Sequence, residues 1–432
     1  MLGPDSRLLT VMLIAVSAGL IVAAVRLRLL PVKILCGTIS IIVAMTGGIA
    51  AVNYYYGYYT SWGQLYSDFH GSAAGNLGTV AATSTSTALG SGRIGWVTID
   101  GKLSGYDRSA LVYLPPQYGQ EQYARVRFPV VELFHGTPGS PKAWITVLHI
   151  NQVMDELIAK HLIGPMILVM PSINASMHDA QDCVNSPDIE DETYVYKDVR
   201  SYMLAHYRAS SDPFEWSVSG YSSGGFCAAN LALRHPSSFG AAAIINGYYR
   251  AVDGPAADAL KHSQPLENAY SPLYLAENLK PDSSPVPAFW VAAGSNDKQD
   301  YKPAQLFTTA LDRIQQVPFI TLKNVADTAN GWATALPGAL TWLWQQVAPP
   351  DLRVLFPVRT YSIKDLNSAL YVPPAKHGPT KCKAATPSIP STESVPATQS
   401  AAAKAPCVMS TPKPVKQAQV QTASGAFKKT AA

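Results

Sequence analysis

The sequence predicts an α/β fold, a mostly parallel β-sheet with helices on both faces, preceded by two transmembrane helices. Three observations predict it. Two uncharged apolar runs lie near the N-terminus, and strand-like apolar runs then alternate with helix-like stretches, with a glycine–serine turn joining one such strand to the next helix. Of the 432 residues, 47% are hydrophobic and only 14% are charged, which suits a large buried core together with membrane segments.

The two apolar runs, residues 8–25 and 34–52, each approach the roughly 20 residues that a helix needs to cross a bilayer. The loop between them, RLRLLPVK, holds three basic residues, whereas the preceding flank holds one basic residue opposed by an aspartate. The positive-inside rule therefore predicts a cell-membrane protein with two spans, a cytoplasmic loop and both ends outside. The alternative is a signal peptide followed by a buried helix, although no A-x-A-like cleavage site precedes a polar start.

Composition divides the chain into five predicted segments. Tyrosines and a tryptophan after the second span favour the membrane–water interface, and the C-terminal stretch holds too few apolar residues to form a core. The predicted segments are two transmembrane helices with a short basic loop (1–53), an interfacial aromatic segment and flexible spacer (54–94), the α/β domain (95–348), an extension (349–372), and a disordered tail rich in Pro, Ala, Ser and Lys (373–432).

Within residues 95–348, periodicity and apolar runs indicate the elements of the sheet and its helices. Strands are expected at 97–99, 109–114, 130–134, 166–170, 216–219, 241–245, 288–292 and 319–322. Helices are expected at 151–160, 193–206, 225–234, 303–315 and 332–346.

Charge and cysteine usage exclude several classes of function. The formal net charge of +4 and the lack of a basic stripe with interleaved aromatics argue against nucleic-acid binding. The five cysteines form no C-x-x-C motif, which argues against a zinc ribbon or a thioredoxin-type site. No metal or organic cofactor is predicted. Cys183 and Cys227 both lie in the globular region, where they either pair in an oxidising compartment or remain free thiols.

The motif that carries chemistry is Gly220-Tyr221-Ser222-Ser223-Gly224, a G-x-S-x-G sequence between an apolar strand and a helix. In this context the motif predicts a nucleophile elbow, a tight turn that lifts the Ser222 hydroxyl above the sheet. The flanking glycines are needed because backbones crowd there, and the Ser223 N–H is aimed at the oxyanion of a reacting ester.

A second oxyanion donor is expected from the loop His135-Gly136-Thr137-Pro138-Gly139-Ser140, which follows the buried strand VVELF. Its predicted donor is the Thr137 N–H. His135 is interpreted as a structural imidazole that holds this loop, because it precedes the nucleophile and lies on the oxyanion side.

These residues resemble the esterase-D-like and mycolyltransferase branch of the α/β-hydrolases, in particular membrane-anchored actinobacterial members. The resemblance covers about residues 54 to 347. The matching stretches are SGYDRSALVYLPPQY (104–118), FHGTPGSPKAW (134–144), DCVN…ETYVYKDV (182–199), SGYSSGGFCAANLALRHP (219–236) and AGSND (293–297). It implies an α/β-hydrolase fold and a serine esterase or acyltransferase that acts on esters or envelope lipids. It also implies a disulfide between Cys183 and Cys227.

A catalytic triad in this fold runs in the order nucleophile, acid, histidine. Asp297 fits the acid position, with Asp300 as a second choice, although an aspartate there is also an ordinary turn residue. In the relatives the histidine precedes, by five residues, a tryptophan that begins the last helix. Counting back from Trp332 places Asp327 at that position.

No histidine lies between Asp297 and residue 348, so the base that should activate Ser222 is missing from its expected place. His262 and His178 are the candidate substitutes. An aspartate is ordinarily ionised, with a pKa of about 4, which makes Asp327 a poor base at neutral pH. Its neighbour Asp297 adds like-charge repulsion.

Three hypotheses follow. The first is a membrane-anchored extracytoplasmic esterase or acyltransferase with a lipid or other ester as substrate. The second is a catalytically degenerate hydrolase fold that binds a lipid, glycolipid or partner without turnover, with the tail contacting the cell envelope. The third is a purely structural membrane protein. It does not explain the elbow and the oxyanion loop, which bring no structural benefit.

Overall fold

The structure is a computed structural model that describes residues 3–4, 6–56, 62, 75–76, 91–174, 181–250, 254–280 and 285–358. The predicted tail, most of the predicted spacer and His178 lie outside the described residues.

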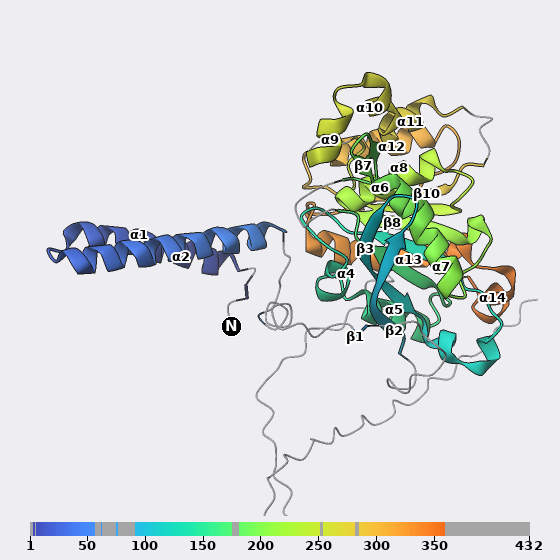
Figure 1. Cartoon of the computed structure of the whole chain (residues 1–432), viewed down its shortest axis with the longest axis horizontal. Helices are drawn as coiled ribbons and strands as arrows, with labels where there is room; N and C mark the ends of the chain where they lie inside the picture. The colour runs from blue at the N-terminus through green and yellow to red at the C-terminus, as the bar shows by residue number, and fades with distance from the viewer. Residues whose placement is uncertain are drawn as a thin grey trace, which may run out of the picture. The chain divides into compact units, whose positions relative to one another are not determined.

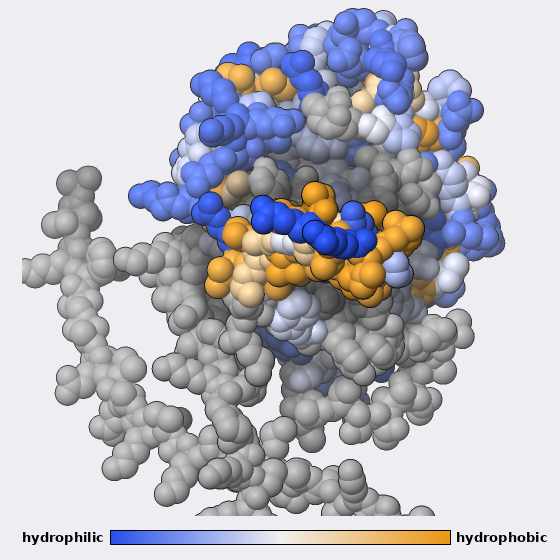
Figure 2. Space-filling view, turned by 90° about the vertical axis from the view of Figure 1, so that its left-hand side faces the viewer, coloured by the Kyte–Doolittle hydropathy of each residue, from blue (hydrophilic) through white to orange (hydrophobic). Residues whose placement is uncertain are grey.

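The N-terminal segment is a hairpin of two helices, α1 (Arg7–Arg26) and α2 (Leu30–Tyr56) (Figure 1). Both are long and apolar enough, by length and composition, to cross a membrane. The helices are joined by paired serines, because the Ser17 hydroxyl lies 2.9 Å from the Ser40 hydroxyl and each bonds the other's carbonyl. The outward surface of the hairpin is largely hydrophobic, with hydrophilic residues at the end facing the viewer in Figure 2. The second helix extends four residues past its predicted end at residue 52.

A nine-stranded sheet forms the centre of the folded domain, in the order β1-β2-β3-β5-β4-β8-β9-β10-β11. The β2–β3 and β3–β5 pairs are antiparallel and the others are parallel. Every strand predicted from the sequence is present, which confirms the α/β-hydrolase-type fold. The strands are β1 (Gly75–Asn76), β2 (Arg93–Gly101), β3 (Tyr106–Leu114), β4 (Val130–Phe134), β5 (Ile167–Pro171), β8 (Trp216–Tyr221), β9 (Ala241–Ile245), β10 (Ala288–Gly294) and β11 (Phe319–Leu322).

Helices cover both faces of the sheet, since β4, β5, β8 and β9 are buried along their whole length. Helices α5 and α13 pack together, while α11 packs against both α8 and α12. The predicted helices correspond to α5 (Ile150–Ala159), α7 (Val199–His206), α8 (Ser223–Arg234), α12 (Tyr301–Leu311) and α13 (Ala329–Val347). The predicted helix at 193–206 is interrupted, since α6 (Asp191–Thr193) is followed by a π turn (Tyr194–Asp198) before α7.

Several short elements were missed, because segments of two to seven residues show little periodicity. Their local signals are present in the sequence. Ser263 and Ser271 cap α10 and α11, and each of these helices has a proline in its first turn. The missed elements are α4 (Ala143–Thr146), α9 (Gly254–Leu260), α10 (Gln264–Ala269), α11 (Pro272–Asn278), α14 (Pro350–Leu355), the two-residue strands β1 (Gly75–Asn76, inside the predicted spacer), β6 (Asn185–Ser186) and β7 (Ile189–Glu190), and 3-10 turns at Pro116–Gly119, Glu121–Tyr123 and Pro213–Glu215.

Candidate active site

Ser222 lies between the end of β8 and the start of α8, at the carboxyl edge of the sheet. Its φ of 55° and ψ of −124° are outside the conformations that an L-residue with a side chain ordinarily adopts. Its N–H donates to the carbonyl of Ile245 at 3.1 Å, which ties the turn to the neighbouring strand β9. The surrounding sheet therefore holds this serine in a strained turn, as the G-x-S-x-G motif predicts.

The two glycines of the motif are needed because backbones approach closely at the turn. A Cβ atom on Gly220 would lie 2.2 Å from the carbonyl oxygen of Gly224, and one on Gly224 would lie 2.1 Å from the carbonyl oxygen of Phe134. Gly136 is similarly close to the nucleophile, because a Cβ atom there would lie 3.1 Å from the Ser222 Cβ. The elbow therefore packs directly against the loop that follows β4.

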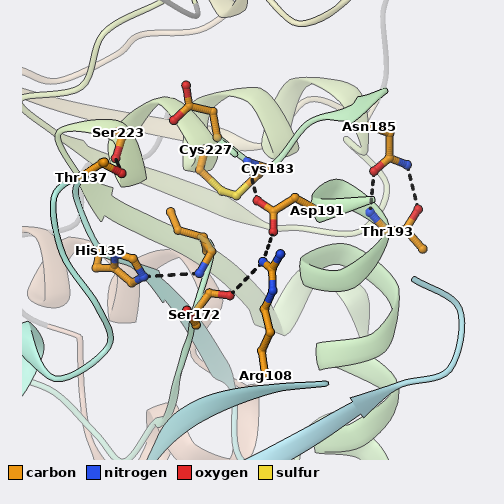
Figure 3. Close-up of a disulfide and its surroundings, with 12 residues drawn as sticks. Arg108, His135, Thr137, Ser172, Cys183, Asn185, Asp191, Thr193, Ser223 and Cys227 are labelled. Carbon is orange, nitrogen blue, oxygen red and sulfur yellow. Dashed lines mark hydrogen bonds and ion pairs between the residues drawn. A yellow bond between two sulfur atoms is a disulfide. The ribbon is translucent and has the colours of Figure 1, made fainter. Parts of the chain in front are cut away.

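Side-chain hydrogen bonds fix the predicted oxyanion loop beside the start of α8 (Figure 3). The Thr137 hydroxyl accepts from the Ser223 hydroxyl at 3.1 Å and from the Asn174 amide at 2.8 Å. The Thr137 and Ser223 backbone N–H groups remain the predicted oxyanion donors, and the N-terminus of α8 favours negative charge there. Asn174 was not singled out from the sequence, since nothing local links it to Thr137.

His135 is buried and holds its own loop. Its Nε2 accepts the N–H of Ile173 at 3.3 Å, which leaves the proton on Nδ1 to donate to the Gly136 carbonyl at 2.9 Å. Burial lowers the pKa of His135 to about 4, so the ring is neutral at physiological pH. These contacts support the structural interpretation of this imidazole.

Asp327, in the loop between β11 and α13, lies at the nucleophile. Its side chain is hydrogen-bonded to that of Ser222, and its Oδ1 accepts from the Trp332 indole Nε1 at 2.6 Å. Trp332 in turn stacks on Tyr221, the residue before the nucleophile, with ring centroids 4.2 Å apart. The sequence identified Trp332 only as the start of a helix, whereas the structure makes it a direct partner of the carboxyl group.

The pKa of Asp327 differs from its sequence-based expectation. Burial first, and then the charges of Asp297 and Asp300, raise it to about 7 although the Ser222 and Trp332 hydrogen bonds oppose the shift. The ordinary value of about 4 was therefore the wrong reference for this carboxyl group, because the sequence does not reveal its complete burial.

Asp297 is buried at the turn after β10. Its Oδ1 accepts the N–H groups of Gln299 at 3.2 Å and Asp300 at 3.1 Å, which is the turn role considered as the alternative. Burial and the charge of Asp297 raise the pKa of Asp300 to about 7. The charge of Asp297 also acts on Asp327, the carboxyl group at the position where the sequence led us to expect the triad histidine.

Several described histidines lie in other surroundings. His262, a candidate substitute base, is exposed in the turn between α9 and α10. His206 stacks on Tyr202, and His235 contacts Glu192 at 2.7 Å. Within these described residues, the side chain that bonds the Ser222 hydroxyl is Asp327. No group of described His, Cys, Asp or Glu residues is arranged to hold a metal ion.

The disulfide between Cys183 and Cys227 is present, with Cα atoms 5.3 Å apart (Figure 3). It ties the segment after β5 to the second turn of α8. Asp191 supports the same segment, because it accepts the Cys183 N–H at 2.8 Å and pairs with Arg108 at 2.5 Å. The elbow helix is thus covalently joined to its surroundings, while Cys36 is a free thiol.

A largely polar cavity of about 420 Å³ lies beside the oxyanion loop. It shares Ser140 with that loop and Asn174 with the Thr137 hydrogen bond. Its lining residues are Trp96, Asp107, Arg108, Ser109, Ser140, Pro141, Ser172 and Asn174.

This chain belongs to the putative esterase family, whose model matches residues 102–323, just over half of the 432 residues. The chain is 30% identical over 152 residues to an uncharacterized protein of Corynebacterium glutamicum, covering 35% of each chain. It is 27% identical over 157 residues to an endo-1,4-beta-xylanase/feruloyl esterase of Xylanibacter ruminicola, covering 36% of this chain and 22% of that protein. These matches therefore span about a third or less of the curated relatives' length.

Solved structures share the fold. A ferulic acid esterase aligns with a TM-score of 0.51 at 22% identity, covering 59% of this chain and 98% of that chain. An S-formylglutathione hydrolase from Agrobacterium tumefaciens aligns with a TM-score of 0.51 at 18% identity, covering 61% of this chain and 99% of that chain. The finer resemblance to the mycolyltransferase branch remains a prediction.

Proposed function

We propose that this protein is a membrane-anchored serine esterase that attacks ester carbonyls with Ser222 on the outer side of the membrane. The observation that carries the proposal is the strained Ser222 turn, packed against the Gly136–Thr137 loop and hydrogen-bonded to a buried carboxyl group. A strained backbone with an activated hydroxyl is what acyl transfer needs, and structural stability alone gains nothing from it.

The chemistry has two steps. Ser222 Oγ adds to the ester carbonyl, and the negative oxygen that forms is stabilised by the Thr137 and Ser223 N–H groups. Release of the alcohol leaves an acyl group on Ser222. Water then removes this group in hydrolysis, or an acceptor alcohol removes it in acyl transfer.

The membrane anchor is proposed from the hairpin. Large apolar side chains such as Val25 and Ile49 are more than 70% exposed on it, a surface that lipid would cover. Basic residues gather at the α1–α2 turn, which favours a cytoplasmic turn and an outward-facing hydrolase domain. The Cys183–Cys227 disulfide supports the same orientation, because such bonds persist mainly in oxidising compartments.

The polar cavity beside Thr137 is proposed to hold the polar part of the ester substrate. Arg108 and Asp107 supply charge there, Ser140 and Asn174 supply hydrogen-bonding groups, and Trp96 supplies an aromatic ring. This lining suits a polyol or lipid headgroup better than a hydrocarbon chain. Envelope lipids are the substrates that agree best with both this lining and the membrane anchor.

The enzyme proposal is tested by turnover of short-chain p-nitrophenyl esters by the full chain in detergent, with Ser222→Ala as the test variant. Thr309→Ala, which removes an exposed hydroxyl on α12, is the matched control. We expect Ser222→Ala to lose turnover and Thr309→Ala to keep it. Equal rates in wild type and Ser222→Ala would eliminate Ser222 as the nucleophile for these esters.

Orientation is tested separately, by adding protease to intact cells that express the chain with an epitope in the hydrolase domain. We expect the epitope to be lost without lysis. An epitope that survives until lysis would contradict the outward-facing arrangement while leaving the esterase proposal untouched.

The second candidate is a binding protein without turnover, and the observation that favours it is the carboxyl group in place of an imidazole beside Ser222. Binding of an ester analogue by both wild type and Ser222→Ala, with hydrolysis by neither, would select this reading over the esterase.

A further inference from the structure

We propose that Asp327 is the general base of this site and takes the Ser222 proton directly, in place of a histidine. The inference rests on the esterase function proposed above and assigns the missing step of that function. It requires a carboxyl group in contact with the nucleophile, fixed in orientation, and able to accept and return a proton near neutral pH.

The contact and the orientation are both present. Ser222 and Asp327 are hydrogen-bonded through their side chains, and the Trp332 indole N–H holds the Oδ1 atom of the carboxyl group at 2.6 Å. Trp332 is 2% exposed and stacks on Tyr221, whose ring also packs edge-on against Trp144 at 5.1 Å. The base and the nucleophile are therefore connected through one packed aromatic cluster, so their separation is set by the core.

The electrostatic surroundings suit proton transfer near neutral pH. Burial raises the pKa of Asp327, and the carboxylates of Asp297 and Asp300 on the β10–α12 turn raise it further. Tyr248 follows β9 and is buried near Asp327, and the charge of Asp327 helps to raise the pKa of the Tyr248 hydroxyl. An ordinary aspartate is too weak a base for this role, whereas a carboxyl group that titrates near 7 is matched to it.

The proton and the electron pairs balance with these residues alone. As Ser222 Oγ bonds to the ester carbon, its proton moves to the Asp327 carboxylate and the carbonyl electron pair moves to the oxygen. The intermediate then collapses, the ester C–O bond breaks, and the Asp327 proton passes to the departing alkoxide. In the second step Asp327 takes a proton from water as the water oxygen attacks the acyl carbon. Collapse of that intermediate releases the acid, and the proton returns to Ser222.

The test measures kcat/KM for p-nitrophenyl acetate from pH 5 to pH 9 with the full chain in detergent. We expect wild-type activity to rise with pH to a plateau, with an apparent pKa near 7. The pKa of a carboxyl group changes little with temperature whereas that of an imidazole falls on warming, so the profile should stay in place between 10 and 35 °C. Asp327→Asn should lose about 10²- to 10⁴-fold at the plateau, the usual contribution of a general base.

Two further variants report a shift of the pH profile, which a merely structural role of Asp327 would not produce. Asp300→Asn removes a neighbouring charge and should move the profile to lower pH. Trp332→Phe removes a hydrogen bond that favours the ionised carboxylate and should move it to higher pH. Asp258→Asn, an exposed carboxylate on α9, is the matched control and should leave the profile in place.

The failure of this inference is distinguishable from that of the esterase proposal. If Asp327→Asn kept more than a third of wild-type activity while Ser222→Ala was inactive, Asp327 would not be the base. Ser222 would still be the nucleophile. An inactive wild type that gains Ser222-dependent turnover as Asp327→His would also overturn Asp327 as the base and identify a degenerate site. A complete lack of Ser222-dependent turnover in every variant would overturn both proposals. Circular dichroism of each variant shows that a lost activity is not lost folding.

Discussion

Replacing Asp327 by asparagine should make the protein more stable, and increasingly so as the pH rises. The fold raises the pKa of this carboxyl group from 3.8 to about 7, mainly by burial, so ionising it opposes folding. Raising the pKa from 3.8 to about 7 corresponds to about 4 kcal/mol of lost stability when the group is ionised. This penalty is absent below about pH 4. It grows between about pH 4 and pH 7, because the Asp327 carboxyl group is then ionised in the unfolded chain but still protonated in the folded chain. It is complete above about pH 7. Asparagine has the same shape and carries no such penalty.

Of the 4 kcal/mol, about 3 kcal/mol develops between pH 5 and pH 8. For a domain of this size that corresponds to about 6 to 12 °C in the unfolding midpoint. Thermal unfolding of the full chain in detergent, followed by tryptophan fluorescence at several pH values, measures the difference between Asp327→Asn and wild type.

Ser222→Ala is the matched control, because it abolishes the nucleophile but keeps the buried charge. Ser222→Ala should gain none of the pH-dependent stability. The comparison therefore separates an effect of lost catalysis from the stabilisation that follows when the buried Asp327 charge is removed. An Asp327→Asn gain that is the same at pH 5 and pH 8 would refute the reasoning, because only a titrating carboxyl group makes the gain depend on pH.

Two other perturbations follow from the packing around the elbow. Gly136→Ala places a methyl group 2.9 Å from the Tyr221 ring and 3.1 Å from the Ser222 Cβ. We therefore expect at least about 10-fold lower kcat/KM and a cost of about 1 to 3 kcal/mol in unfolding free energy. Unchanged kinetics in Gly136→Ala would show that the loop after β4 accommodates the methyl group without displacing Ser222. Cys183→Ser together with Cys227→Ser opens a loop of 44 residues and should cost about 4 kcal/mol. Chemical denaturation measures it, and a stability unaltered by the double change would contradict a disulfide in the native protein.

The sheet and the elbow were predictable because their determinants are local. Apolar runs such as 130–134 and 241–245 are buried on both faces, and such strands read as continuous hydrophobic stretches. The turn at Ser222 is specified by glycines within two residues of it, and the structure leaves no room for a Cβ atom on either of them.

The chemistry of Asp327 was not predictable from the sequence, because it depends on contacts between distant segments. Its position five residues before Trp332 placed it at the site, yet its proton affinity is set by burial and by Asp297 and Asp300, about thirty residues away. Asn174 was missed for the same reason, since its amide reaches Thr137 across 37 residues. Sequence patterns locate such groups on strands and loops, but only the folded geometry determines which of them share a buried environment.

The stability and the catalysis of this protein should report the same titration. The pH dependence of kcat/KM follows ionisation of the free enzyme, and the pH dependence of the Asp327→Asn stability gain levels off where that same carboxyl group ionises in the folded chain. The kinetic midpoint and the pH at which the stability gain levels off should therefore both fall near 7. Asp300→Asn should move both to lower pH together, because the Asp300 charge raises the pKa of Asp327. If the kinetic midpoint stayed in place while the levelling-off pH moved, the group that limits the reaction would be something other than Asp327. The strain at Ser222 would then serve a different base.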